Sequence, residues 1–244
     1  MGLTAVFLAE LLELKRADAI PGRRMIEIGA HQLSNFFLRA VAELNEIYRL
    51  FDATYVSLGS ETDRNAPDWL EMIRPTSPMS ERFWRSLGFS YTAIEFEGRH
   101  GVMSFDLNTD PIPAAMLGAY DLLVNAGTTE HVFNQDHAFR VMHDLVAPGG
   151  IMMHTGPATG WAMHGLYQYS PKFFWKLCDS NDYEILRLQL FPWRSRPIPS
   201  QIIDSNAKWG SARYPPLPAE LMEVGYVAIL RKRNDLKFRI PIDV

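Results

Sequence analysis

Hydrophobic positions change their spacing along the chain, and this change predicts an alternation of strands and helices. Short apolar runs that end at polar residues or glycine predict strands, and apolar residues three or four positions apart predict helices. The predicted strands span residues 24–28, 91–96, 102–105, 120–124, 151–155, 183–190 and 224–231, and the predicted helices 4–17, 35–51, 80–87, 136–146 and 171–178. This order indicates an α/β protein with an open, mostly parallel sheet that is covered on both faces.

Two long stretches interrupt the alternation. Residues 52–87 contain three prolines and one short predicted helix, and residues 191–218 are rich in proline and aromatic residues. Long loops inside a compact domain are usually lids or binding loops. We therefore interpret both stretches as insertions in one domain, residues 1–244, that begins with the helix at 4–17.

Composition narrows the classes of protein that the chain could represent. The 244 residues are 47% hydrophobic, which is enough to form one large core. The single Cys178 excludes an internal disulfide framework. The net charge of −4 favours neither nucleic acid nor a membrane surface as a partner. No secretory signal or apolar run of about 20 residues is present, so we expect a cytoplasmic protein.

Several short motifs follow the predicted strands in a fixed order. They are Ile26-Glu27-Ile28-Gly29-Ala30, Ile94-Glu95, Phe105-Asp106-Leu107, Tyr120 to Val124 leading into Thr129-Glu130-His131-Val132, and Pro148-Gly149-Gly150. Together they resemble the class I S-adenosylmethionine-dependent methyltransferases over residues 24–232. The resemblance implies a Rossmann-like, doubly wound, mostly parallel seven-stranded sheet with helices on both faces and an antiparallel last strand. It also implies S-adenosylmethionine as cofactor, with the N-terminal helix and both insertions covering the cofactor face.

The same resemblance gives a set of expected cofactor-binding residues. They are Glu27, Gly29, Ala30, His31, Glu95, Asp106, Leu107 and Asn125. Gly29 would let the backbone approach a ligand, and Glu95 would accept the ribose hydroxyls. Asp106 would bind the adenine or form a local turn. Only the first glycine of the usual loop is present, His31 replaces the second, and Gly29 lies much further from Glu95 than the ~20 residues of a standard dinucleotide unit.

Candidate catalytic residues follow the fourth and fifth strands. His131 is the predicted general base, because a neutral imidazole accepts a proton near neutral pH. Glu130 is predicted to orient it, and His164 is the second choice for the base. Tyr167 and Tyr169 are candidate substrate contacts, with packing of their own loop as the alternative. His154 and His164 could add ligands to Glu130 and His131, but the set is not closed, so we expect no metal.

The predicted function is methyl transfer to an oxygen or nitrogen of a small acceptor, such as a sugar. The alternatives are a methyltransferase fold that has lost catalysis and acts as a binding or scaffold protein, and a nicotinamide-dependent oxidoreductase. The second is weaker because no G-x-G-x-x-G follows the first strand. We expect no membrane partner, and the composition disfavours nucleic acid as a partner. Formation of a homo-oligomer is compatible with the sequence.

Overall fold

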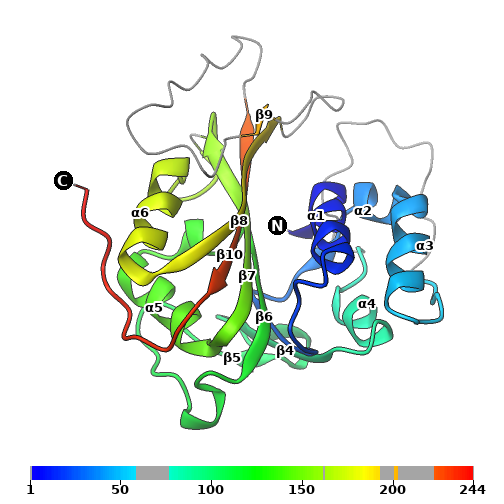
Figure 1. Ribbon diagram of the computed structural model, residues 1–244, viewed down its shortest axis with the longest axis horizontal. Coiled ribbons are helices and arrows are strands. Elements are labelled where there is room, and N and C mark those ends of the chain that lie inside the picture. Colours follow the sequence, from blue (N-terminus) through cyan, green and yellow to red (C-terminus); the bar gives the residue numbers. More distant parts are fainter. Residues whose placement is uncertain (1, 59–76, 162, 193–200, 203–222, 244) are drawn as a thin grey trace.

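An eight-stranded sheet forms the centre of the molecule (Figure 1). The computed structural model describes residues 2–58, 77–161, 163–192, 201–202 and 223–243. The strands are β2 (Arg24–Ile28), β4 (Ser90–Glu95), β5 (Met103–Ser104), β6 (Tyr120–Ala126), β7 (Val146–Thr159), β8 (Tyr183–Pro192), β9 (Gln201–Ile202) and β10 (Val224–Lys232). Their order across the sheet is β5-β4-β2-β6-β7-β10-β8-β9.

The pairing of these strands confirms the predicted Rossmann-like sheet. Strands β5, β4, β2, β6 and β7 are parallel, and β10 runs antiparallel to both β7 and β8. The chain leaves β2 toward β4 on one side and later returns to β6 on the other, so the strand order reverses between β2 and β6. The short strand β9, in the second insertion, extends the sheet beyond the predicted seven strands.

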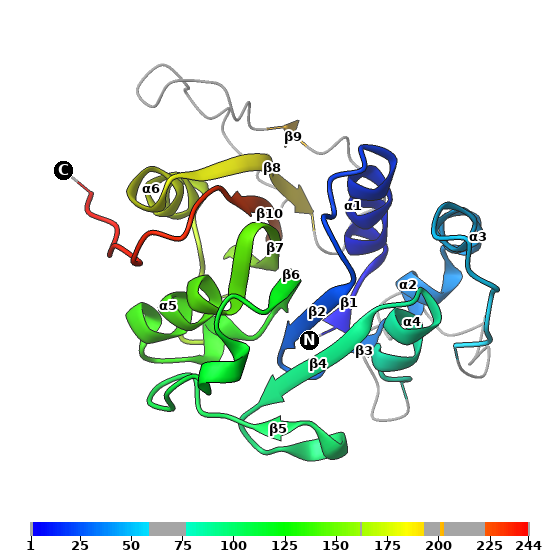
Figure 2. The ribbon, with the colours of Figure 1, turned by 60° about the horizontal axis from the view of Figure 1, so that its bottom comes forward.

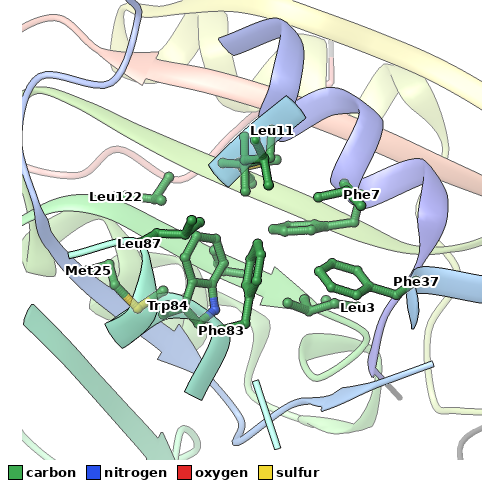
Figure 3. Close-up of a cluster of buried hydrophobic side chains, with 14 of the residues drawn as sticks. Leu3, Phe7, Leu11, Met25, Phe37, Phe83, Trp84, Leu87 and Leu122 are labelled. Carbon is green, nitrogen blue, oxygen red and sulfur yellow. The ribbon is translucent and has the colours of Figure 1, made fainter. Parts of the chain in front are cut away.

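Helices cover the sheet from two sides, as predicted (Figure 2). One layer contains α1 (Ala5–Arg16), α2 (Asn35–Arg39), α3 (Val41–Leu50) and α4 (Glu81–Ser86), and the other contains α5 (Gln135–Leu145) and α6 (Pro171–Asn181). In the first layer, Phe83 and Trp84 of α4 pack with Leu3, Phe7 and Phe37, and all five are at most 1% exposed (Figure 3). Burying each side chain of this size contributes roughly 1.5–3 kcal/mol.

The N-terminal segment lies against this layer. Thr4 caps α1 by accepting a hydrogen bond from the backbone of Phe7, and the preceding strand β1 (Gly2–Leu3) pairs in parallel with β3 (Gln32–Leu33). The buried side of α1 faces the sheet and the other helices of its layer. None of the described helices is long and apolar enough to cross a membrane.

Two predicted elements differ from the structure. The helix expected over residues 35–51 is two helices, because Ala40 adopts ψ 58 and interrupts the hydrogen-bond pattern. The break allows Phe37 of α2 and Ile47 of α3 both to reach the core, so tertiary packing overrides the helix propensity of alanine. The fifth predicted strand, β7, begins at Val146, before the Pro-Gly-Gly turn. Its pairing with β6 shifts in register between Tyr120 and Leu122 of β6.

The two insertions are described only in part. The predicted short helix of the first insertion is α4, and Met79 just before it forms an isolated bridge with Gln32. Residues 59–76, 193–200 and 203–222 lie outside the described residues. Whether the insertions cover the cofactor face therefore stays a prediction.

Candidate active site

A cavity of about 480 Å³ lies at the carboxyl ends of β2, β4 and β6. It is lined by residues 29–31, 94–96 and 105–108 and by Gly127, Thr128, His131 and Val132. This is the point where the strand order reverses, which is the usual ligand site of open α/β sheets. The volume is in the range of small-molecule pockets. A larger and shallower hollow of about 720 Å³ lies beside α4, away from the strand ends.

Glu27 lies beneath this cavity as a fully buried carboxylate surrounded by donors. Trp84 Nε1 donates to Oε1 at 2.6 Å, Tyr91 OH donates to Oε2 at 2.9 Å, and Ser80 Oγ lies within 2.8 Å of both oxygens. The backbone N–H of His31 donates to Oε2 at 3.1 Å. Burial raises the pKa of Glu27, but His31 and these hydrogen bonds outweigh it and hold the pKa below its ordinary value. Glu27 thus anchors the loop after β2, and its side chain does not line the cavity.

The backbone conformation at the end of β2 requires a glycine at position 29. Its φ is +84°, and a Cβ at this position would lie 2.4 Å from Oγ1 of Thr128. That hydroxyl donates to the carbonyl of Ile28 at 2.6 Å, so it is held in place. The glycine allows β2 and the loop after β6 to approach each other as they form the cavity floor.

His31 lies where the family motif has its second glycine. Its ring is 2% exposed, and Nε2 accepts a hydrogen bond from the backbone N–H of Ala126 at 3.2 Å. The other ring nitrogen, Nδ1, faces the carboxylate of Glu27 and lies 3.3 Å from its Oε2. The ring is held between the ends of β2 and β6, and the cavity of about 480 Å³ remains beside it.

Glu95 and Asp106 both line the cavity but differ in their partners. Oε2 of Glu95 is buried and has no hydrogen-bond partner, which is unusual for a buried polar atom. Oδ1 of Asp106 accepts from the backbone N–H and the side-chain amide of Asn108, both at 2.8 Å, and these bonds lower the pKa of Asp106. The predicted local turn is therefore present at Asp106, whereas the ligand role of Glu95 stays a prediction. Ala30 and Leu107 also line the cavity.

Asn125 is not among the residues that line the cavity, so its role in cofactor binding stays a prediction. Its side chain is fully buried below the cavity, where Nδ2 contacts Thr129 Oγ1 at 2.9 Å and Nδ1 of His154 at 3.2 Å. Burial lowers the pKa of His154 to about 3, so this imidazole stays neutral. The Asn125 side chain supports the turn after β6 and does not reach the cavity.

The candidate catalytic residues meet at one edge of the cavity. Glu130 and His131 belong to the 3₁₀ turn η4 (Thr129–His131), and His164 comes from the loop after β7. Glu130 is fully buried, neither carboxyl oxygen has a hydrogen-bond partner, and burial raises its pKa to about 7. Its Oε1 lies 3.6 Å from Nε2 of His164. Glu130 therefore contacts His164, and its predicted role in orienting His131 stays a prediction.

The two histidines of this edge lie next to each other. Their ring centroids are 5.1 Å apart, and His131 lines the cavity. Burial, and then repulsion from His164, lower the pKa of His131. Its imidazole is therefore neutral at physiological pH and can accept a proton or bind a cation.

Tyr167 and Tyr169 pack the loop that carries His164. The hydroxyl of Tyr167 donates to the carbonyl of Phe133 at 3.0 Å, and that of Tyr169 donates to Gln135 at 2.5 Å. Tyr169 is 4% exposed and belongs to the core on the α5 side. These contacts fit the packing alternative for both tyrosines, and their role as substrate contacts stays a prediction.

The sequence alone does not identify the donors around Glu27. A carboxylate in an apolar strand requires partners, and this was the available signal. Ser80, Trp84 and Tyr91 lie 53 to 64 positions further along the chain, however, and no local spacing links them to Glu27.

Comparisons with known proteins give structural matches only. No family model and no curated protein matches the sequence. The trans-methyltransferase CalH, solved in complex with SAH, is 14% identical with a TM-score of 0.46, over 93% of this chain and 55% of that one. An S-adenosylmethionine-dependent methyltransferase from Mesorhizobium loti is 10% identical with a TM-score of 0.45, over 92% of this chain and 99% of that one.

A third match was solved with a substrate. It is a 1,6-didemethyltoxoflavin-N1-methyltransferase from Burkholderia thailandensis with bound 1,6-didemethyltoxoflavin and S-adenosylhomocysteine. It is 10% identical with a TM-score of 0.46, over 93% of this chain and 78% of that one. These three similar structures are methyltransferases. The chain spans about half the length of the first of them, and the identities are too low to transfer their ligands or substrates to this chain.

Proposed function

We propose that this chain transfers a methyl group from S-adenosylmethionine to an oxygen or nitrogen of a small acceptor, with a sugar as one candidate. The observation that supports this most is the cavity at the strand-order reversal. Glu95, whose Oε2 has no hydrogen-bond partner, lines one part of it, and the neutral His131 lines another. One pocket therefore offers Glu95 to a nucleoside and His131 to an acceptor.

The cofactor residues of the cavity fit S-adenosylmethionine. Glu95 would accept hydrogen bonds from the ribose hydroxyls, which satisfies its orphaned oxygen. The turn formed by Asp106 and Asn108, together with Leu107, would hold the adenine, and the backbone of residues 29–31 would lie beside the methionyl part. When bound, S-adenosylmethionine supplies an electrophilic methyl group. Glu27 contributes indirectly because it fixes the loop that carries Gly29 and His31.

The acceptor side would be formed by the edge that contains His131. A neutral imidazole lining the cavity can take the proton that the acceptor loses on methylation. Apolar neighbours in the lining, Phe96, Phe105 and Val132, would exclude water from the reacting atoms. Most of the rate enhancement would come from alignment of the two substrates, which contributes about 7–11 kcal/mol in well-oriented reactions.

Titration calorimetry with S-adenosylhomocysteine and with NAD tests the proposal. We expect the purified chain to bind S-adenosylhomocysteine with micromolar affinity and not to bind NAD. Binding of NAD alone would indicate an oxidoreductase instead. Binding of neither compound would favour the alternative of a non-catalytic binding protein.

Replacing Glu95 with alanine is expected to weaken S-adenosylhomocysteine binding about 10- to 100-fold. Hydrogen bonds to a charged group contribute about 1.5–3 kcal/mol, and this carboxylate is the expected ribose acceptor. Glu97→Ala is the matched control, because Glu97 follows β4 closely but is exposed and pairs with Arg99. Equal affinities of wild type and Glu95→Ala, measured by calorimetry, would show that the nucleoside does not bind beside β4.

A further inference from the structure

Glu130, His131 and His164 form a cluster of side chains that could bind a metal ion. One ligand atom from each of these residues lies within 4.8 Å of the other two. We propose that these three side chains bind one divalent transition-metal ion of the Zn²⁺ type. This proposal is based on the contacts of the three residues and does not depend on the methyl transfer proposed above.

Polar atoms of this cluster lack hydrogen-bond partners. Both carboxyl oxygens of Glu130 and Nε2 of His164 are buried and have no hydrogen-bond partner. In the described part of the chain, no lysine or arginine forms an ion pair with Glu130. A buried carboxylate without partners is costly, and a single proton would satisfy only one of its two oxygens. A cation bound by Glu130 and His164 would compensate both residues at once.

Two of the candidate ligand atoms are spaced like neighbouring ligands of a zinc ion. Zinc ligands lie about 2.0–2.1 Å from the ion, so neighbouring ligands of a tetrahedral site are about 3.4 Å apart. Oε1 of Glu130 and Nε2 of His164 are separated by 3.6 Å. That distance is too long for a hydrogen bond but suits two ligands of one ion. A ligand atom of His131 lies within 4.8 Å of both, so small rotations of its side chain would complete the set.

The backbone around the cluster holds the ligands together. The N–H groups of Leu166 and Tyr167 both donate to the carbonyl of Glu130, at 2.8 and 3.1 Å. A Cβ on Gly165 would lie 3.0 Å from that carbonyl oxygen and from Cγ of Glu130, which is a tight contact, so glycine favours the close approach of the loop. The loop that carries His164 is therefore fixed against the turn that carries Glu130 and His131.

The donor types define the class of ion. Two imidazoles and one carboxylate form a typical three-residue set of catalytic zinc sites, which keep a fourth position for water or substrate. Imidazole ligands select transition metals over Mg²⁺ and Ca²⁺. Because His131 also lines the cavity, the open position would face the proposed acceptor. A bound His131 would then act on the acceptor through the ion, and as a base only when no ion is bound.

Metal titration of the full chain tests the site. After treatment with a chelator, we expect the wild type to bind one Zn²⁺ per chain in equilibrium dialysis with elemental analysis. We expect Glu130→Gln and His164→Ala each to weaken binding at least about 10-fold, because loss of a residue that only supports a ligand already costs about 10- to 100-fold in metal affinity. His137→Ala is the matched control, because His137 is a histidine of α5 outside the cluster. Circular dichroism of each variant would check the fold.

Cobalt substitution gives a second measurement that does not rely on variants. Co²⁺ bound by these ligands is expected to give visible d–d absorption in the wild type that added Zn²⁺ removes. No stoichiometric Zn²⁺ binding, or equal binding in the folded Glu130→Gln and His164→Ala variants, would overturn the site. S-adenosylhomocysteine titration of the same samples separates the two proposals, since intact nucleoside binding without Zn²⁺ binding would remove the metal site alone.

Discussion

Replacing Glu27 with alanine is expected to lower the free energy of unfolding by at least about 3 kcal/mol. The substitution would leave the side-chain donors of Ser80, Trp84 and Tyr91 buried without an acceptor. Each unsatisfied buried donor costs about 1–3 kcal/mol. Urea unfolding followed by circular dichroism measures the difference, and the fluorescence of Trp84 should change as well because its indole loses its partner.

Two further substitutions control this experiment. Glu81→Ala removes an exposed carboxylate of α4 that pairs with Arg85, and we expect a change below about 1 kcal/mol. Glu27→Gln keeps the volume but turns an amide N–H₂ toward the donors, so we expect an intermediate loss. A Glu27→Ala protein as stable as Glu81→Ala would show that the three donors find other partners and that Glu27 does not anchor the loop.

His131→Ala is expected to lower turnover about 10²- to 10⁴-fold, the usual contribution of a group that handles a proton. The affinity for S-adenosylhomocysteine should change less than about 3-fold, because Glu95 and the β2 loop remain intact. The measurement is transfer of a labelled methyl group from S-adenosylmethionine to the first compound that the wild type methylates in a panel of small alcohols, sugars and amines. Calorimetry gives the affinity of the same variant.

The control for this prediction is His137→Ala, a histidine whose Nε2 contacts the carbonyl of Asp110. We expect its turnover to match that of the wild type. If His131→Ala also retained turnover, His131 would have no part in the reaction. If its nucleoside affinity fell in parallel with turnover, the histidine would be supporting the cavity and not the chemical step.

Much of the sheet could be predicted because its strands are short apolar runs that stop at a polar residue or glycine. Parallel strands place their carboxyl ends at one edge, so Gly29, Glu95 and His131 had to come close once the strand order was assumed. The break at Ala40 could not be predicted in this way. Alanine favours helix, and only the packing of Phe37 and Ile47 explains why the helix ends there.

The candidate site was less predictable than the fold, because residue type does not reveal which side of a loop a residue occupies. Asn125 and Tyr169 carry groups suited to binding, but both are buried. Glu130 and His164 were both proposed as catalytic residues, yet their mutual contact depends on how the loop after β7 packs on η4. Such contacts between distant segments are determined by the tertiary structure and leave no local pattern.

The position of β10 leaves strand edges unpaired while the polypeptide is being made. This strand comes last of the sheet's strands in the sequence, but it lies between β7 and β8. A ribosome releases residues in order, so β7 and β8 emerge while the edges that β10 will join are still open. Open strand edges invite aggregation. We therefore expect a nascent chain that stops before Val224 to require chaperone protection.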